Sequence, residues 1–273
     1  MNSQIPKISV VTVCYNAVGT IEKTILSVIN QTYPNIEYII IDGASTDGTV
    51  DIINKYRDKI AYFVSAPDNG IYDAMNKGII AATGDWINFM NAGDLFYDSE
   101  VVTKVVKKLD KDADVLLGDV AYKLDGVLYR ERAKPFYEHL PLHHSMGFNH
   151  QSTFVKTEVA KKLKFDLNYR LASDYNMIIT IYRNNGVFQQ LYDIIVALYD
   201  IDGVSAKNRR LHLYETMIVD NPASCFNCIR SYMIYLKGRL KQPIKFLIKI
   251  LYPNYILKRR LSNYEQILSV KDS

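Results

Sequence analysis

Cysteine is scarce in this 273-residue chain, which contains three: Cys14, Cys225 and Cys228. So small and odd a number excludes a disulfide framework and favours a reducing compartment. Cys225 and Cys228 have no second cysteine pair with which to form a zinc site. Glycine and proline are also few, at 13 and 8 residues, which excludes a collagen-like or disordered chain. What is present, 48% hydrophobic and 23% charged residues, indicates one large or two small folded domains.

Long apolar runs are missing as well. No stretch approaches about 18 uninterrupted apolar residues, which argues against a membrane-spanning helix. The opening residues 1–7 lack the basic and then apolar segments of a secretory signal. These absences predict a cytoplasmic protein.

Acidic residues are absent from one part of the chain. Residues 221–264 contain nine Lys or Arg and no Asp or Glu, whereas the rest has 24 basic and 29 acidic residues. Apolar residues recur in this segment at helical spacing: Ile244, Leu247, Ile248 and Leu251. A basic amphipathic segment suits the surface of an anionic membrane, while packing on the rest of the protein or an oligomer contact is the alternative. Because the positive charge is confined to one end, nucleic acid is not the expected partner.

Short apolar runs alternate with helical periodicity over the first 120 residues. The runs typical of buried strands are 8–13, 36–41, 61–65, 86–90 and 115–120. The helical stripes are 21–29, a short one from residue 50, 71–81 and 99–109. Strand followed by helix means parallel strands joined by right-handed crossovers. The sequence therefore predicts an α/β fold, with a mostly parallel, Rossmann-like sheet flanked by helices.

The pattern is looser after residue 120. We expect short strands at 127–129, 152–155, 188–191 and 194–199, and a helix at 172–185. Residues 139–150 form a polar, His-rich stretch that predicts a loop. From about residue 205 the chain becomes helical and basic.

Three predicted strands end in a carboxylate close to a glycine: Asp42, Asp68 and Asp94. Ligands of open α/β sheets bind beyond the carboxyl ends of the strands. Each residue alone is explained as an ordinary turn residue. Three at the same sheet edge predict side chains that converge on a divalent cation with a diphosphate, on ribose hydroxyls or on a uracil ring. The dinucleotide and P-loop glycine patterns are absent, since Gly19 is the single glycine after the first strand.

Several separated motifs, in order, resemble those of family 2 glycosyltransferases. They are Ile8-Ser-Val-Val-Thr-Val-Cys-Tyr-Asn16, Ile39-Ile-Ile-Asp-Gly-Ala-Ser-Thr-Asp-Gly-Thr49, Asp68-Asn-Gly-Ile-Tyr-Asp-Ala-Met-Asn-Lys-Gly78 and Gly84-Asp-Trp-Ile-Asn-Phe-Met-Asn-Ala-Gly-Asp94. The resemblance covers roughly residues 6–215 and is strongest to bacterial members that build capsule, O-antigen and exopolysaccharide repeat units. It implies a GT-A fold and transfer of a hexosyl or N-acetylhexosaminyl group from a nucleotide sugar, with inversion at the anomeric carbon.

The resemblance also implies roles on the nucleotide side. The matching residues are Thr12, Tyr15, Asp42, Asp68 and Asp94. Thr12 and Tyr15 match positions that line the nucleotide pocket, and Asp42 the aspartate that contacts the nucleoside, usually uridine. Asp94 matches the last aspartate of the metal-binding D-x-D motif, of which Asn91-Ala92-Gly93-Asp94 keeps one acid. One carboxylate with phosphate oxygens and waters still suits Mn²⁺ or Mg²⁺.

Two further segments match on the acceptor side. Residues 169–176 resemble the segment in which an aspartate opens a helix, which implies that Asp174 is the general base. The alternative is that Ser173 or Asp174 only caps that helix. Residues 149–154 also match, and imply that His150 and Gln151 face the diphosphate or the acceptor, with an ordinary loop as the alternative.

A third segment, 203–215, resembles the flexible part that closes over donor phosphates. It contains Arg209, Arg210 and Glu215, and arginine suits phosphate through charge-assisted contacts. An exposed basic loop is the alternative. The resemblance thus predicts a GT-A domain over 1–215, with a nucleotide-binding half to about residue 120 and an acceptor half beyond it. Residues 216–273 would form a helical, basic extension.

The expected function is metal-dependent inverting transfer from a UDP-sugar to a growing, lipid-linked glycan at the inner face of the cell membrane. A nucleotidyltransferase acting on sugar phosphates is the alternative enzyme, although it would bring a Gly-rich basic loop after the first strand. The third hypothesis is a non-catalytic, membrane-associated binding module on the same scaffold. Retention of Asp42, Asp94 and Asp174 argues against that module.

Overall fold

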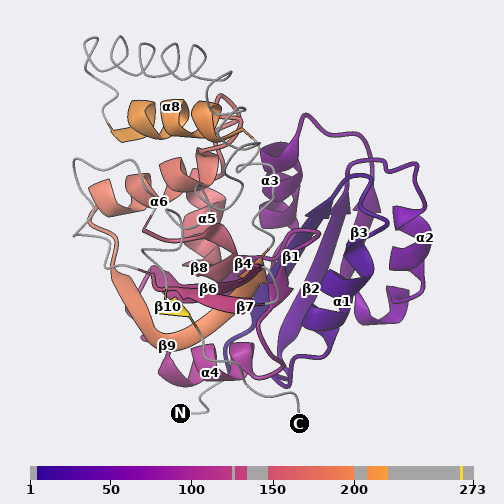
Figure 1. Cartoon of the computed structure of the whole chain (residues 1–273), viewed down its shortest axis with the longest axis horizontal. Coiled ribbons are helices and arrows are strands. Elements are labelled where there is room, and N and C mark those ends of the chain that lie inside the picture. The colour runs from indigo at the N-terminus through magenta and orange to yellow at the C-terminus, as the bar shows by residue number, and fades with distance from the viewer. Residues whose placement is uncertain (1–4, 125–126, 134–146, 200–207, 221–264, 267–273) are drawn as a thin grey trace, which may run out of the picture.

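One curled sheet runs through the protein in the computed structural model, which describes residues 5–124, 127–133, 147–199, 208–220 and 265–266 (Figure 1). Its strands are β1 (Ile8–Cys14), β2 (Ile36–Asp42), β3 (Tyr62–Ser65), β4 (Trp86–Phe89), β5 (Leu95–Phe96), β6 (Val115–Leu124), β7 (Val127–Glu131), β8 (Thr153–Lys156), β9 (Phe188–Tyr199) and β10 (Glu265–Gln266). They are ordered β10-β7-β6-β8-β4-β1-β2-β3, and β9 pairs with β5 and β6.

The parallel half of the sheet consists of β3, β2, β1 and β4. β1 and β2 are β-branched runs that form strands because both of their faces are covered, and every residue of β1 is buried. Since β8 lies antiparallel between β4 and β6, β6 again points in the direction of β1, and β9 runs parallel to β6. The predicted α/β class with a mostly parallel sheet is therefore confirmed.

Helices cover both faces of the sheet. The apolar residues of α1 (Ile21–Ile29), α2 (Thr49–Asn54) and α4 (Val101–Lys108) pack into the core on one face. Those of α3 (Ile71–Ala81), α5 (Thr157–Leu163) and α6 (Ser173–Arg183) pack into a second core on the other. The alternation of side chains along each strand supplies both cores, so that Val10 faces the first and Val11 the second.

The structure corrects several predicted elements. β9 is one strand where two were expected, because Leu191–Ile194 form a bulge against β6 and Asp193 has a positive φ of 63°. α5, β5 and β10 were not expected, nor were the short 3-10 helices η1 (Arg57–Lys59) and η3 (His150–Ser152). η3 replaces the end of the predicted polar loop and leads directly into β8.

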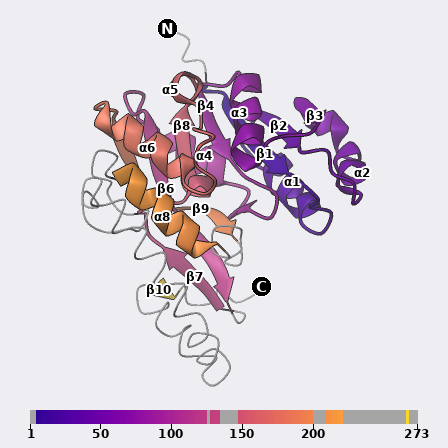
Figure 2. The same cartoon turned by 90° about the horizontal axis from the view of Figure 1, so that it is seen from above.

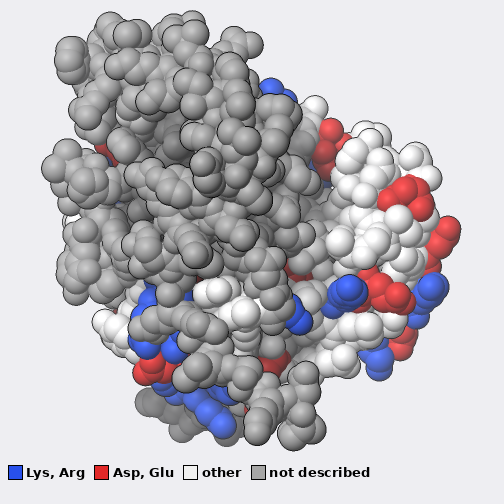
Figure 3. All heavy atoms as spheres, viewed as in Figure 1, with Lys and Arg blue, Asp and Glu red and all other residues white. Residues whose placement is uncertain are grey.

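The last long helix, α8 (Arg209–Asp220), lies along α6 (Figures 1 and 2). It confirms helical structure after residue 205 for these twelve residues, and the predicted domain boundary at 215 falls within it. The basic segment 221–264, with Cys225 and Cys228, lies outside the described residues, as do His139, His143, His144 and residues 203–205. Over the right-hand part of Figure 3, where Figure 1 draws α1, α2 and β3, acidic and basic side chains are interspersed.

Close packing of α3 on β1 generates a test of the fold. A Cβ atom at Gly78 would overlap the side chain of Val11. We expect Gly78→Ala to lower the free energy of unfolding by about 1–3 kcal/mol, although alanine favours a helix, because the core is overpacked. Gly19→Ala is the control, since a methyl group there meets nothing within 4 Å among the described residues. Urea unfolding measures both, and equal stabilities would contradict the prediction.

Candidate active site

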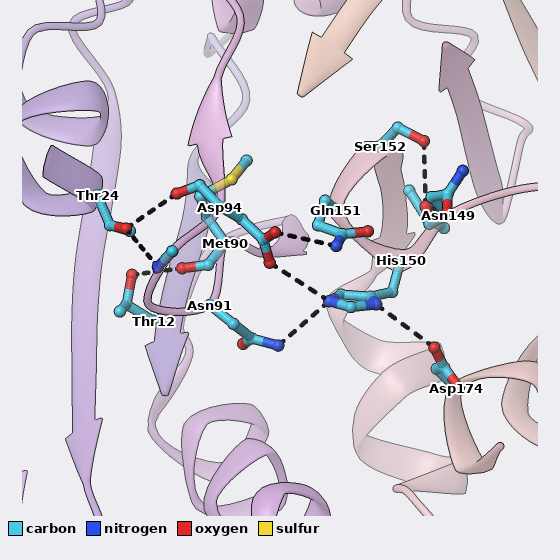
Figure 4. Close-up of polar contacts among 12 residues, drawn as sticks. Thr12, Thr24, Met90, Asn91, Asp94, Asn149, His150, Gln151, Ser152 and Asp174 are labelled. Atoms are coloured by element: carbon cyan, nitrogen blue, oxygen red, sulfur yellow. Dashed lines mark hydrogen bonds and ion pairs between the residues drawn. The ribbon is translucent and has the colours of Figure 1, made fainter. Parts of the chain in front are cut away.

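The turn after β4 carries Asn91 and Asp94 (Figure 4). The Asp94 N–H donates to the Asn91 carbonyl oxygen at 2.9 Å, and Gly93 takes a φ of 107° that glycine adopts without strain. Thr24 of α1 holds the turn from one side, since its Oγ1 accepts from the Gly93 N–H at 3.0 Å and donates to the Asp94 carbonyl oxygen at 2.9 Å. The Asp94 side chain is thereby fixed at the carboxyl edge of the sheet.

His150 of η3 lies between two carboxylates (Figure 4). Its Nδ1 is 3.5 Å from Asp174 Oδ2, and its Nε2 is 3.8 Å from Asp94 Oδ2. The Nε2 atom is also 3.2 Å from Asn91 Nδ2, and Gln151 Nε2 donates to Asp94 Oδ1 at 3.1 Å. The fold thus joins residues from the turn after β4, η3 and α6, which the motifs predicted separately.

The neighbouring charges shift the pKa values of His150 and Asp174. Burial, the largest influence on His150, favours the neutral ring, but hydrogen bonding to Asp174 and the charges of Asp174 and Asp94 outweigh it and raise the pKa of His150. Burial likewise favours the protonated form of Asp174, yet His150, the Tyr175 N–H and the Tyr72 hydroxyl together lower its pKa. Asp174 is therefore ionised at neutral pH and able to accept a proton.

Asp174 is the second residue of α6, as expected for an aspartate that opens a helix. Its Oδ1 accepts from the Tyr72 hydroxyl and from the Tyr175 N–H, both at 2.9 Å. Ala172 is the N-cap, and no side-chain capping bond is found there among the described residues. The reading of Ser173 or Asp174 as a mere helix cap is therefore not favoured, because Asp174 Oδ2 faces His150.

Asp42 lies at the end of β2 and is fully buried. Its Oδ2 accepts from the Ser45 N–H at 2.9 Å and from the Ser65 hydroxyl at 2.6 Å, while its Oδ1 accepts from the Ser45 hydroxyl at 2.5 Å. The Cys14 thiol is 3.4 Å from Oδ1, and burial raises the pKa of this thiol. The Asp42 carboxylate thus ties β1, β3 and the loop after β2 together.

Tyr15 and Asp68 lie next to Gly43, directly after Asp42. A Cβ at Gly43 would lie 2.6 Å from Asp68 Oδ2 and 3.3 Å from Tyr15 Cδ2, so the glycine allows both side chains to approach the loop. Tyr15 is 67% exposed, and Asp68 Oδ1 accepts from the Gly70 N–H at 2.8 Å. An exposed aromatic ring beside a carboxylate forms a surface on which a planar ring can lie.

Thr12, like Asp42, is fully buried. It donates to the Met90 carbonyl oxygen at 2.7 Å, and its Oγ1 is 3.1 Å from the Tyr38 hydroxyl. Thr12 thus supports the start of the Asn91–Asp94 turn from below (Figure 4). Its contact with a nucleotide stays a prediction.

Sequence reasoning missed two contacts of this site and misjudged a third residue. Tyr72 and Asn91 both lie within motifs that were recognised, but no local pattern indicates that they meet Asp174 and His150. Glu215 lies in the segment that the resemblance implies closes over donor phosphates; in the structure it is buried and accepts hydrogen bonds from the backbone N–H groups that precede α6. Arg209 and Arg210 begin α8, and their side chains lie outside the described residues.

Residues 9–164 match the model of the glycosyl transferase family 2. The chain belongs to this family. An uncharacterised glycosyltransferase of Mycobacterium tuberculosis is 33% identical over 181 residues, 64% of this chain and 68% of the relative. A glycosyltransferase of PGL/p-HBAD biosynthesis from Mycobacterium bovis is 25% identical over 212 residues, 71% of this chain and 77% of the relative.

Solved structures share the fold of this family 2 glycosyltransferase. S. aureus TarS 1–349 in complex with UDP-GlcNAc superposes with a TM-score of 0.61 at 20% identity, covering 84% of this chain and 70% of that one. The mannosyltransferase PcManGT of Pyrobaculum calidifontis, in complex with GDP-Man and Mn²⁺, gives 0.62 at 19% identity, covering 80% and 64%. The GT-A fold implied by the motifs is therefore confirmed.

Family 2 membership raises the question of a divalent cation at the turn after β4. Within the described residues, no cluster of three or more His, Cys, Asp or Glu could hold a metal ion by itself. Asn91 Oδ1, however, is buried and has no hydrogen-bond partner among these residues, in the same turn as the Asp94 carboxylate. A carboxylate and an amide oxygen, completed by substrate phosphates and water, fit the oxygen preference of Mg²⁺ and Mn²⁺.

The His150–Asp174 pair predicts a pH-dependent contribution to stability. The pKa of His150 is raised above 6.5 and that of Asp174 lowered below 3.8. The stability that protonated His150 contributes is fully present below pH 6.5 and is lost as the pH rises through its raised pKa. The stability that ionised Asp174 contributes is present above pH 3.8 and is lost as the pH falls through its lowered pKa. We therefore expect His150→Gln to lower the free energy of unfolding more at about pH 5.5 than at about pH 9.

Tyr72→Phe is the matched control. It removes a hydrogen bond to the same carboxylate, which contributes about 1.5–3 kcal/mol for a charged acceptor. Burial and Asp174 raise the pKa of Tyr72 well above 10, so this loss is equal at both pH values. Urea unfolding at the two pH values measures both variants. A His150→Gln effect that does not change with pH would refute the charged pair.

Proposed function

We propose that this protein transfers a sugar from a nucleotide sugar to a glycan acceptor, with inversion at the anomeric carbon. The observation that carries the proposal is the row Asp94–His150–Asp174, in which two ionisable carboxylates flank one imidazole at the carboxyl edge of the sheet. Asp94 belongs to the side of the leaving diphosphate and Asp174 to the side of the incoming hydroxyl. Membership of the glycosyl transferase family 2 supports this assignment.

In the proposed reaction, the acceptor hydroxyl oxygen forms a bond to the anomeric carbon while the bond from that carbon to the diphosphate oxygen breaks. The hydroxyl proton passes to the Asp174 carboxylate, and the nucleoside diphosphate leaves with the bonding electrons. The Tyr72 hydroxyl and the Tyr175 N–H hold Asp174 Oδ1, which leaves Oδ2 on the side of His150. Attack and departure on opposite faces of the sugar give inversion.

Asp94 and the Asn91 amide oxygen would hold a Mn²⁺ or Mg²⁺ ion together with the donor phosphates. When bound, such an ion neutralises the charge that develops on the leaving diphosphate. His150 and Gln151 lie beside Asp94 and orient its carboxylate. Arg209 and Arg210 are proposed to contact the donor phosphates, where guanidinium groups make strong charge-assisted bonds.

The donor is proposed to be a UDP-sugar. Tyr15, Asp42 and Asp68 form the nucleotide side, with the exposed Tyr15 ring offering a stacking surface and Asp42 shaping the loop beneath it. Structures with this fold include one in complex with UDP-GlcNAc and one in complex with GDP-Man and Mn²⁺. Calorimetric titration with a panel of UDP- and GDP-sugars distinguishes between the two nucleotides.

The acceptor is proposed to be a lipid-linked glycan in bacterial surface polysaccharide synthesis, reached from the cytoplasmic face of the membrane. No described helix has the length and apolar character needed to cross a bilayer. Nine Lys or Arg without any Asp or Glu over residues 221–264 suit attraction to anionic lipids. We propose a catalytic domain over 1–215, with nucleotide and acceptor halves, and an extension over 216–273 in which the basic segment 221–264 binds the membrane. The first residues of this extension complete α8, which packs on α6.

Asp174→Asn tests the proposed base. We expect UDP to bind unchanged and turnover of the preferred nucleotide sugar to fall by about 10²–10⁴-fold, because the amide cannot accept the proton. Glu158→Gln is the control, since this exposed carboxylate at the start of α5 lies outside the site. Turnover of the nucleotide sugar is measured for both variants in the presence of Mn²⁺. Full activity of Asp174→Asn would remove it from the base role.

The basic segment is tested by fractionation of cells. Deletion of residues 221–273 is expected to move the protein from the membrane to the soluble fraction, because about 1 kcal/mol of attraction is lost for each basic residue near the surface. The deletion also removes β10, which pairs with β7. A second variant, with the nine Lys and Arg of 221–264 changed to Gln, therefore keeps this strand. Unchanged partitioning of both variants would reject the membrane role.

A further inference from the structure

Glu215 of α8 is a charged residue with 5% of its surface exposed. Its carboxylate accepts hydrogen bonds from three successive backbone N–H groups. The Arg170 N–H lies 3.0 Å from Oε1 and 3.1 Å from Oε2. The N–H groups of Leu171 and Ala172 both donate to Oε2, at 2.7 Å and 3.0 Å. Burial of a carboxylate is unfavourable unless its oxygen atoms are satisfied. These bonds satisfy both oxygens and attach residues 170–172 to α8.

The attached segment leads directly to the proposed base. Ala172 is the N-cap of α6, and Asp174 follows two residues later. Leu171 and Ala172 are buried, so their N–H groups depend on Glu215 for a partner in the place of water. A negative charge at this end of a helix is also favoured by the helix dipole. Glu215 thus holds the backbone that precedes Asp174, while Tyr72 and His150 contact the carboxylate of Asp174 itself.

A second set of contacts joins α8 to α6. Arg183 Nη2 donates to the carbonyl oxygens of Val219 at 2.8 Å and Asp220 at 2.9 Å. The Tyr175 hydroxyl donates to Asp220 Oδ1 at 2.6 Å. α8 is therefore held to α6 without Glu215, and the Glu215 contacts have a separate role at the approach to α6.

We propose that Glu215 is a positioning residue that sets the place of the Asp174 carboxylate in the site. The proposal rests on the function of Asp174 as the general base given above. A displacement of about 1 Å in a catalytic group costs about 10²-fold in rate. Loss of the three N–H contacts frees the backbone two residues before Asp174, so the reaction slows while the nucleotide side is unaffected.

Glu215→Leu and Glu215→Gln test this role. Leucine fills the volume without any acceptor, and we expect kcat for hydrolysis of the preferred nucleotide sugar to fall by about 10²-fold. Glutamine keeps one oxygen for Leu171 and Ala172, so it should restore part of that loss. The Kd for UDP with Mn²⁺, measured by calorimetry, should change by less than about twofold for both variants, since the loss is confined to the transition state.

Arg183→Gln is the matched control, because it removes the contacts to Val219 and Asp220 and leaves residues 170–172 attached to Glu215. We expect a loss of thermal stability without the loss in kcat. The positioning role of Glu215 is overturned if Glu215→Leu keeps the kcat of the wild type, or if its Kd for UDP rises by as large a factor as its kcat falls. It is also overturned if kcat falls as far in Arg183→Gln as in Glu215→Leu.

Amide hydrogen exchange separates this inference from the proposed function. Peptides covering 170–176 should exchange faster in Glu215→Leu, whereas peptides of α3 should not change. Unchanged exchange at 170–176 would overturn the anchoring role whatever the activity. If the wild type turns over no nucleotide sugar, the proposed function fails, and if Asp174→Asn retains full turnover, its role as the base fails. In either case the exchange result still decides whether Glu215 orders this segment.

Discussion

Parallel pairing of β1 with β2 and β4 is the constraint on which the site depends. Parallel strands deliver their carboxyl ends to one edge of the sheet, so the loops that follow them must share the same space. The loops are fitted to each other by hydrogen bonds: Asn16 of the first loop binds Ser45 and Thr46 of the second, and Thr24 of α1 binds the turn after β4. Asp42 at the end of β2 and Asp94 after β4 therefore lie at the same edge of the sheet, although they are far apart in sequence.

The site then depends on how buried and half-buried charged groups are satisfied. Asp174 and Asp94 are balanced by the imidazole of His150, a group that can carry a proton. Asp42 and Glu215 instead accept hydrogen bonds from hydroxyl and backbone N–H groups, which neither gain nor lose a proton near neutral pH. The first arrangement suits a group that takes part in proton transfer, and the second suits a group that fixes the backbone.

Periodicity predicted much of the fold. The helix expected at 71–81 is α3, and the strand expected at 36–41 is β2 with one residue added, since long regular elements carry a strong apolar pattern. It predicted two strands where β9 is one, because the bulge at residues 191–194 interrupts the alternation of side chains. α5 was missed, since a seven-residue helix spans only two turns and presents too few apolar residues to make a stripe.

The sequence by itself determined the α/β class, the position of Asp94 after a strand and of Asp174 at the start of a helix, because these follow from local periodicity and motif spacing. Only the tertiary structure decided that His150 lies between them, that Tyr72 contacts a carboxylate 102 positions away and that Glu215 holds residues 43–45 positions earlier. The physical reason is that a strand or helix encodes its own repeat, whereas contacts between distant side chains depend on how the two helical layers pack against the sheet.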